Sequence, residues 1–242
     1  MIKVNKILGG AALATVLALS LDASSHVRTG PYVGLNVGYA NLNPNAKVRD
    51  DANAADIGNG LKLNQHKGMF QTNLFAGYEW LLQNNLVLGT ELTFGGSFSG
   101  TKKGYDASLP AFAGDIRCYK IRQQWKTGLY GLVGTSLTER VSLYGKLGIL
   151  YGRFQSDHGN DVAVTGAPSS TIKKNTNLFG VEPGIRMKVA LSESWAATFD
   201  ASYAFYQNKK QTIFTTNAGQ VQALKKFAPR VWGITAGLAY KF

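Results

Sequence analysis

Few residues of this sequence are of the types that carry acid–base, nucleophilic or metal chemistry. In 242 residues there are 3 histidines, His26, His66 and His158, and 1 cysteine, Cys118, all in segments without a strand pattern. No Cys/His cluster has metal-ligand spacing, and no nucleophile elbow or phosphate loop occurs. A base needs a nucleophile or an activated water beside it, and His66 and His158, the candidate bases, have no evident Ser/Asp partner. The sequence therefore predicts no enzyme, no cofactor and no metal site. A single cysteine excludes an internal disulfide framework and leaves a free thiol or an intermolecular bridge.

Charged residues that alternate with apolar ones offer a second kind of chemistry. They fall on one face of segments whose other face is apolar. If these segments are the strands of an eight-stranded barrel, its interior is just wide enough for its own side chains, and paired charges on the inward face would fill it. The alternative is that ions pass through this network. A charge assigned to the wrong face would instead lie on the surface of the barrel that faces lipid, where it costs ~2–4 kcal/mol. The expected interior network is Glu79, Glu91, Lys126, Lys146, Glu182, Arg186, Lys188 and Asp200.

A short turn between two of these segments relates two of the acids. With three loop residues in that turn, Glu91 lies opposite Gly77 and diagonal to Glu79. Glycine carries no side chain, so we expect room there for one cation to reach both carboxylates.

Eight segments with period-2 alternation must position these charges. Alternate side chains of a strand point to opposite faces, and here one face is apolar and aromatic while the other is small or polar. Most segments reach the ~9–11 residues that a tilted strand needs to cross a bilayer. The segments are about residues 30–42, 68–80, 86–96, 120–133, 141–154, 177–190, 195–206 and 232–242.

The connections between these segments alternate in length. Three are short (81–85, 134–140 and 191–194) and four are long (43–67, 97–119, 155–176 and 207–228). This alternation predicts an all-β fold, an eight-stranded antiparallel up-and-down transmembrane β-barrel. A soluble lipocalin-like barrel also has eight strands, but it would keep polar residues outside, whereas aromatic residues cluster here at strand ends as in membrane girdles.

The N-terminal segment has the layout of a secretory signal peptide. Lys3 and Lys6 precede an apolar stretch at residues 7–21, and small polar residues follow. About fifteen apolar residues fall short of the ~20 that a spanning helix needs, so cleavage is favoured over a membrane anchor. We expect a signal peptide at residues 1–23, with cleavage after Ser20 or Ser25 as alternatives, and one barrel domain at residues 24–242.

Five motifs carry a family resemblance over nearly all of the chain after residue 29: GPYVG at 30–34, FAGYEW at 75–80, GTEL at 89–92, LYGKLG at 143–148 and GLAYKF at 237–242. With them the chain resembles the small OmpA-like and Opa-like outer-membrane β-barrel family, also described as porin-family or surface-antigen proteins of Gram-negative bacteria. The resemblance implies extracellular loops, periplasmic termini, and a C-terminal assembly signal, Tyr240 and Phe242, read by the barrel-assembly machinery. It departs from full-length OmpA proteins because no periplasmic peptidoglycan-binding domain follows the barrel, so anchoring to the cell wall is not implied.

Basic residues gather at the expected outer strand ends, in a chain with a formal net charge of +12. Such a collar could bind the phosphates of lipopolysaccharide; ordinary solvated loop bases are the alternative, and export argues against nucleic acid. The collar is Lys67, Lys120, Arg122, Arg153, Lys173, Lys174, Lys209, Lys210, Lys225, Lys226 and Arg230.

The resulting functional expectation is a structural, surface-exposed barrel that displays four extracellular loops, for membrane integrity, as a surface antigen or in adhesion to a host or environmental ligand. A narrow passive channel is the alternative, followed by a barrel enzyme.

Overall fold

The computed structural model describes residues 29–50, 61–63, 67–82, 85–98, 105–107, 116–161, 171–215 and 221–242. These residues form 13 strands in two sheets. Within them, no helix has the length and apolar character to cross a membrane.

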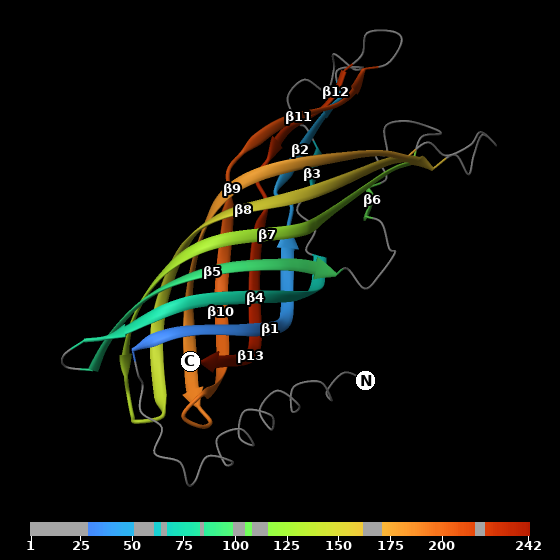
Figure 1. Ribbon diagram of the computed structural model, residues 1–242. Helices are drawn as coiled ribbons and strands as arrows, with labels where there is room; N and C mark the ends of the chain where they lie inside the picture. The colour runs from blue at the N-terminus through green and yellow to red at the C-terminus, as the bar shows by residue number, and fades with distance from the viewer. Residues whose placement is uncertain are drawn as a thin grey trace, which may run out of the picture.

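Eight antiparallel strands close into a barrel (Figure 1). Each strand pairs with the next around the ring, and the first pairs with the last, from Tyr32↔Lys241 to Asn43↔Arg230. The eight-stranded up-and-down barrel expected from the alternation is confirmed. In ring order its strands are β1 (Gly30–Asn43), β4 (Lys67–Leu81), β5 (Leu86–Phe98), β7 (Ile116–Ser136), β8 (Val141–Asp161), β9 (Thr171–Ala190), β10 (Trp195–Tyr206) and β13 (Arg230–Lys241).

The two ends of the barrel differ. At the turn end, residues 82–85, 137–140 and 191–194 join consecutive strands, and Thr29 accepts a hydrogen bond there from the Leu81 amide at 2.9 Å. Phe242 also lies at this end, where its amide donates to the Pro31 carbonyl at 3.2 Å. The opposite end, the loop end, carries the longer connections.

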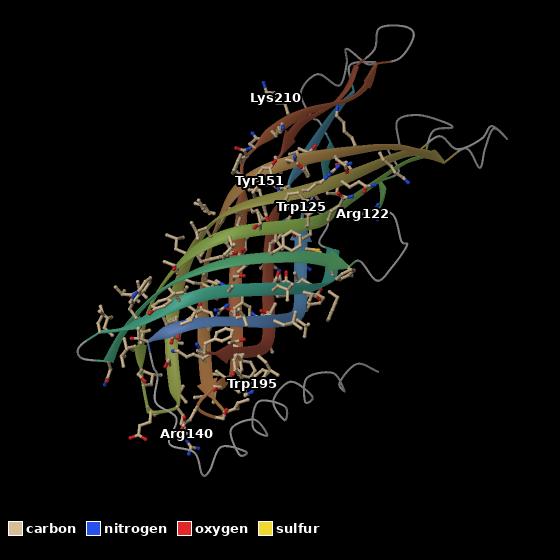
Figure 2. The ribbon with its side chains drawn as sticks, viewed as in Figure 1. Arg122, Trp125, Arg140, Tyr151, Trp195 and Lys210 are labelled. Carbon is tan, nitrogen blue, oxygen red and sulfur yellow. The ribbon has the colours of Figure 1, made fainter. Side chains whose placement is uncertain are left out.

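The outer surface is apolar between two groups of aromatic rings. Apolar residues at alternate positions are exposed, as in Leu74, Leu147 and Ile185 at 58%, 63% and 59%. Figure 2 shows Trp125 and Tyr151 toward the loop end and Trp195 near the turn end. The loop-end rings contact one another from strand to strand in the series Phe94, Trp125, Tyr151, Phe179, and the turn-end rings in the series Trp195, Tyr240, Phe242. Aromatic girdles of this kind flank the lipid-facing band of outer-membrane barrels.

Three strands continue past the barrel at the loop end. β5 pairs with β7 only as far as Trp125, and β10 pairs with β9 only as far as Gly180, whereas β7, β8 and β9 remain paired with one another beyond these points. We call this extension the arm: residues 116–124, 152–161 and 171–178. A short strand, β6 (Tyr105–Ala107), pairs with its β7 edge.

A second sheet of four strands stands at the same end, in the order β11 (Lys209–Thr215), β12 (Val221–Phe227), β2 (Ala46–Asp50) and β3 (Leu61–Leu63). The expectation that residues 43–67, 97–119, 155–176 and 207–228 are loops without strands was therefore wrong. Outside a membrane neither face of a sheet must be apolar, so runs such as Lys173-Lys174-Asn175-Thr176 form strands without an alternating signal.

The same error misplaced two residues. Cys118 lies in β7, in register with Gly159, and His158 lies in β8, in register with Tyr119. Both had been assigned to loops. His26 and His66, and the signal peptide expected at residues 1–23, lie outside the described residues.

Candidate functional site

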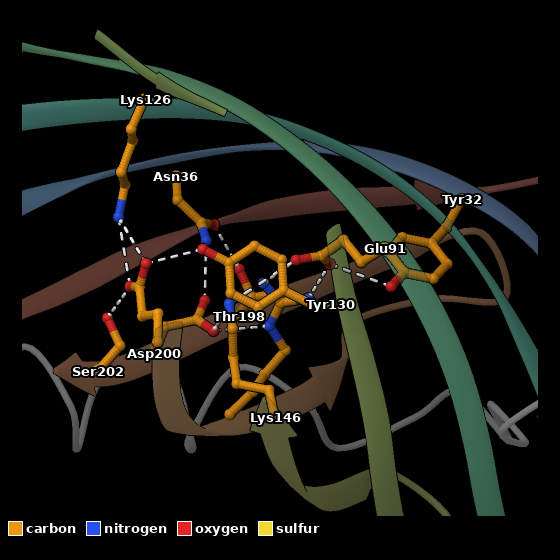
Figure 3. A network of polar contacts seen from close by, with 11 residues as sticks. Tyr32, Asn36, Glu91, Lys126, Tyr130, Lys146, Thr198, Asp200 and Ser202 are labelled. Carbon is orange, nitrogen blue, oxygen red and sulfur yellow. Dashed lines mark hydrogen bonds and ion pairs between the residues drawn. The ribbon is translucent and has the colours of Figure 1, made fainter. Parts of the chain in front are cut away.

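The centre of the barrel interior is occupied by a buried guanidinium between two carboxylates. Arg186 of β9 donates through Nη2 to Glu91 Oε1 at 3.0 Å, through Nη1 to the other oxygen of Glu91, and through Nε to Asp200 Oδ1 at 2.8 Å. Lys146 Nζ approaches the same two acids, at 3.7 Å from Glu91 Oε1 and 3.4 Å from Asp200 Oδ1. Glu91 and Arg186 are only 1% and 2% exposed. Four formal charges thus cancel within one buried cluster (Figure 3).

A second group lies at the turn end of the lumen. Glu79, 1% exposed, accepts from Lys188 Nζ at 2.9 Å and from Lys241 Nζ at 3.4 Å. Lys188 Nζ also lies 4.6 Å from the centre of the Tyr32 ring, a distance at which a cation is attracted to the face of the ring.

A third group surrounds Glu182. Its carboxylate accepts from Lys126 Nζ at 3.1 and 3.2 Å, from the Tyr130 hydroxyl at 2.7 Å and from the Ser202 hydroxyl. Lys146 connects this group to the central one, because its Nζ lies 4.3 Å from the centre of the Tyr130 ring. Figure 3 shows Lys126 and Ser202 reaching the same carboxylate.

All eight residues expected in the interior thus lie on the inward face, and each has an opposite-charge partner there. Lys241 and the neutral members of this network were not predicted from the sequence. Asn36 donates to Asp200 Oδ2 at 2.8 Å and accepts from Thr198, and Tyr32 donates to Glu91 Oε2 at 3.0 Å. They could have been found as polar residues on the inward face of a strand whose neighbouring strand carries an inward-facing charge.

The expected arrangement around Gly77 was wrong in one respect. Gly77 is in register with Glu91, as expected. The space over the glycine, however, is filled by the Tyr32 ring, whose Cζ lies 2.6 Å from where a Cβ would be. Different cations bind the two acids in the part of the chain that the structure describes: Arg186 binds Glu91, while Lys188 binds Glu79.

Beyond the ion pairs, toward the loop end, the lumen is filled by apolar side chains. Phe227, which is fully buried, comes from β12 of the second sheet and lies 5.9 Å from the ring of Phe154, which in turn lies 4.8 Å from Tyr206. We call this cluster the apolar stopper: Leu42, Met69, Ile121, Phe154, Leu178, Tyr206, Phe227 and Val231. A cavity of about 20 Å³ lies among Lys126, Lys146, Glu182 and Arg186, which is room for roughly one water molecule.

Within the described residues, no group of three or more His, Cys, Asp and Glu side chains could hold a metal ion. Each interior carboxylate accepts from at least one cation, and Glu91 and Glu182 accept from hydroxyl groups as well, so these carboxylates serve as acceptors of structural hydrogen bonds.

The expected basic collar is divided among several elements. Arg122 and Arg153 lie on the arm and are half-buried; Lys173 and Lys174 lie on β9 of the arm; Arg230, which is exposed, opens β13. Lys209 and Lys210 are exposed on β11, so they belong to the second sheet and not to an end of a barrel strand. The backbone of Lys67 is in β4, that of Lys120 in β7, and that of Lys225 and Lys226 in β12.

The residues expected to form the assembly signal lie on the outer face at the turn end. The Tyr240 ring contacts Trp195 at 5.1 Å and Phe242 at 5.2 Å, and Phe242 is 73% exposed.

Two kinds of known protein are similar to this chain. The 31 kDa outer-membrane immunogenic protein of Brucella melitensis is 26% identical over 220 residues, which are 88% of this chain and 83% of that protein. Among solved structures, a major outer membrane protein of Thermus thermophilus has a TM-score of 0.47 and 17% identity, covering 86% of this chain and 99% of that one. The attachment invasion locus protein Ail of Yersinia pestis has a TM-score of 0.38 and 16% identity, covering 89% and 100%.

A model of the family described as the outer membrane protein beta-barrel domain matches residues 11–242. This match spans the closed barrel, its ion-paired interior and its aromatic girdles, and the chain therefore belongs to the outer membrane protein beta-barrel domain family.

Proposed function

We propose that the protein is a sealed structural barrel of the outer membrane that holds its loop-end sheets at the cell surface. The observation that carries this proposal is the filled lumen: three ion-paired groups in series, with the apolar stopper above them. A barrel of eight strands has little room beyond its own side chains. The protein acts here by position and exposed surface, without catalysis.

Conductance separates this proposal from a narrow passive channel. We expect the refolded protein in planar lipid bilayers to give no reproducible channel events, because the charges of the lumen are held by partners and the cavity among them has about 20 Å³. Regular current steps that depend on protein concentration would show a water path and contradict the sealed barrel.

The loop end faces the outside of the cell in this proposal, and the turn end faces the periplasm. Support comes from the length of the arm and second sheet, since outer-membrane barrels carry short periplasmic turns and long extracellular connections. The relative in Brucella melitensis bears the name of an immunogenic protein, which suits a surface-exposed chain. Export through a signal peptide at residues 1–23 belongs to the same proposal.

Cysteine labelling tests this orientation. In a Cys118→Ser background, we expect Lys210→Cys on β11 to react with a membrane-impermeant maleimide on intact cells. Arg140→Cys, in a turn at the other end, should react only after permeabilisation; Figure 2 shows Lys210 and Arg140 at opposite ends of the molecule. The reverse pattern of labelling would overturn the orientation while leaving the sealed lumen untouched.

Two partners complete the proposal. The collar residues on the barrel strands and the arm, without Lys209 and Lys210 of the second sheet, attract the phosphate groups of lipopolysaccharide, because cations near an anionic leaflet are drawn to it. The barrel-assembly machinery recognises the last strand, in which Tyr240 and Phe242 present their rings on the outer face.

A further inference from the structure

The outer face of the arm carries two arginines directly beyond the loop-end aromatic rings. Trp125 of β7 is in register with Arg153 of β8, and Arg122 of β7 is in register with Gln155. The rings of Trp125 and Tyr151 are 5.7 Å apart, and Figure 2 shows Arg122 farther from the barrel than Trp125. Girdle aromatics lie at the membrane interface, so the two guanidinium groups lie at the height of the lipid headgroups.

A β-bulge in β7 gives Arg122 this position. The register with β8 shifts between Gln123 and Trp125, so Gln124 is an extra residue. Strict alternation counted from Trp125 would send Arg122 into the lumen. The bulge instead turns Gln123 inward, where its Nε2 donates to the Tyr206 hydroxyl at 3.0 Å, and turns Arg122 outward. Re-aiming a side chain is a known role of bulges near functional sites.

Neutral groups hold the first arginine in place. Arg122 Nη2 donates to Gln155 Oε1 at 2.8 Å, and Gln124 Nε2 donates to the same oxygen at 2.6 Å. Between described side chains, no carboxylate forms an ion pair with Arg122 or Arg153. The Nε atoms of both arginines are buried and have no hydrogen-bond partner in that part of the chain. The positive charge of the pair therefore has no opposite charge beside it among the described side chains, and Arg122 is held by Gln155.

The lysines of the arm have a different neighbourhood. Asp157 of β8 is in register with Lys120 of β7 and with Lys173 of β9. The arginines, closer to the aromatic rings, are in register with residues that carry no charge: Gln155 for Arg122, and Asn177 for Arg153 on the β9 side. Neither arginine thus has a charged residue in direct register with it, and the pair can attract an anion from outside the chain.

We propose that Arg122 and Arg153 bind the phosphate group of an outer-leaflet lipid whose acyl chains lie against the apolar surface below Trp125 and Tyr151. Diagonal neighbours on a sheet face lie about 7–8 Å apart, and guanidinium groups form bidentate hydrogen bonds with phosphate. One phosphate between them can therefore accept from both. The ligand is a lipid because the pair borders the lipid-facing surface. This inference rests on the proposed outward orientation of the loop end and narrows the collar to one built site.

The test measures lipid binding to the refolded full chain in detergent by native mass spectrometry, with phosphorylated lipid A, dephosphorylated lipid A and inorganic phosphate as probes. The variant is Arg122→Gln with Arg153→Gln. The control, Lys209→Gln with Lys210→Gln, removes the same charge from exposed positions on β11. Retention of the heat-dependent electrophoretic shift of a folded barrel verifies each variant. We expect the arginine variant to bind phosphorylated lipid A about tenfold more weakly or worse, as the loss of a charged hydrogen bond implies, and the lysine control to bind as the parent does.

One further variant and two possible outcomes decide the inference. Arg122→Lys with Arg153→Lys should lie between parent and glutamine variant, since lysine keeps the charge but loses bidentate geometry. If Arg122→Gln with Arg153→Gln weakens lipid binding no more than the control Lys209→Gln with Lys210→Gln does, the built site is overturned and only a diffuse collar remains. Binding of inorganic phosphate as tight as that of phosphorylated lipid A would overturn the lipid as ligand. None of these results bears on the sealed lumen, which conductance tests separately.

Discussion

Arg186→Met is expected to lower the free energy of unfolding by about 3–5 kcal/mol, because it leaves two buried carboxylates without their main partner. Glu91 and Asp200 are 1% and 6% exposed, and both accept hydrogen bonds from this one guanidinium. Lys146, at 3.4 Å and 3.7 Å from them, can neutralise only one of the two charges. Denaturant unfolding in lipid vesicles, followed by tryptophan fluorescence, measures the change.

The control for Arg186→Met removes the whole charge cluster. Arg186→Met, Lys146→Met, Glu91→Gln and Asp200→Asn together leave no net charge change and no buried ion without a partner. Replacing a complete buried ion cluster by neutral groups is often close to neutral in stability, so we expect this variant to regain most of the lost free energy. If it is no more stable than Arg186→Met alone, packing and not charge explains the loss.

Leu147→Arg is expected to cost about 2–4 kcal/mol in the same assay, the range for a cation on the lipid face at the bilayer midplane. Leu147 is 63% exposed and lies on β8 midway between Leu143, near the turn end, and Tyr151, in the loop-end rings. In water an arginine at so exposed a position would be harmless. The expected cost therefore exists only if this surface faces lipid.

Phe98→Arg is the matched control for the depth of the substituted residue in the bilayer. Phe98 is also 63% exposed, but it ends β5 at the loop end, beyond Phe94 of the aromatic rings. Near the interface the cost of a cation falls to about 0–1 kcal/mol. If both substitutions had similarly small effects on the free energy of unfolding, the outer surface of the barrel would face water and not lipid.

The barrel itself could be predicted from the sequence because lipid imposes one apolar face on every spanning strand. That requirement leaves a period-2 pattern in residues such as Val33, Leu35 and Val37, all exposed in the structure. The arm and the second sheet left no such pattern. Their strands pair outside the lipid-facing band, and segments such as 155–161 are polar on both faces.

The inward charges could also be predicted, but their partners could not. Arg186 on β9 meets Glu91 on β5, two strands that are not neighbours in the ring, so their contact crosses the lumen. Such a contact depends on tilt and stagger, which single-strand alternation does not encode. The bulge at Gln124 is hidden for a similar reason, because Arg122, Gln123 and Gln124 are all polar and no apolar residue among them marks the shift.

The apolar stopper was missed because its residues come from segments of unlike character. Phe154 and Leu178 are on inward faces that were expected to be polar, and Phe227 belongs to a connection that was expected to be a loop. Only the folded chain brings the three together.

The distances along the chain between interior partners set how such a barrel can assemble. Arg186 and Glu91 are 95 residues apart, Lys188 and Glu79 are 109 apart, and Lys241 is 162 residues from the same glutamate. An open sheet has none of these pairs, so a partly folded chain would carry uncompensated charges next to lipid. Neutralisation and ring closure must then occur together. A folding pathway dominated by such distant contacts is slow and exposed to aggregation, and this gives the chain a strong dependence on whatever holds its first and last strands together while the ring closes.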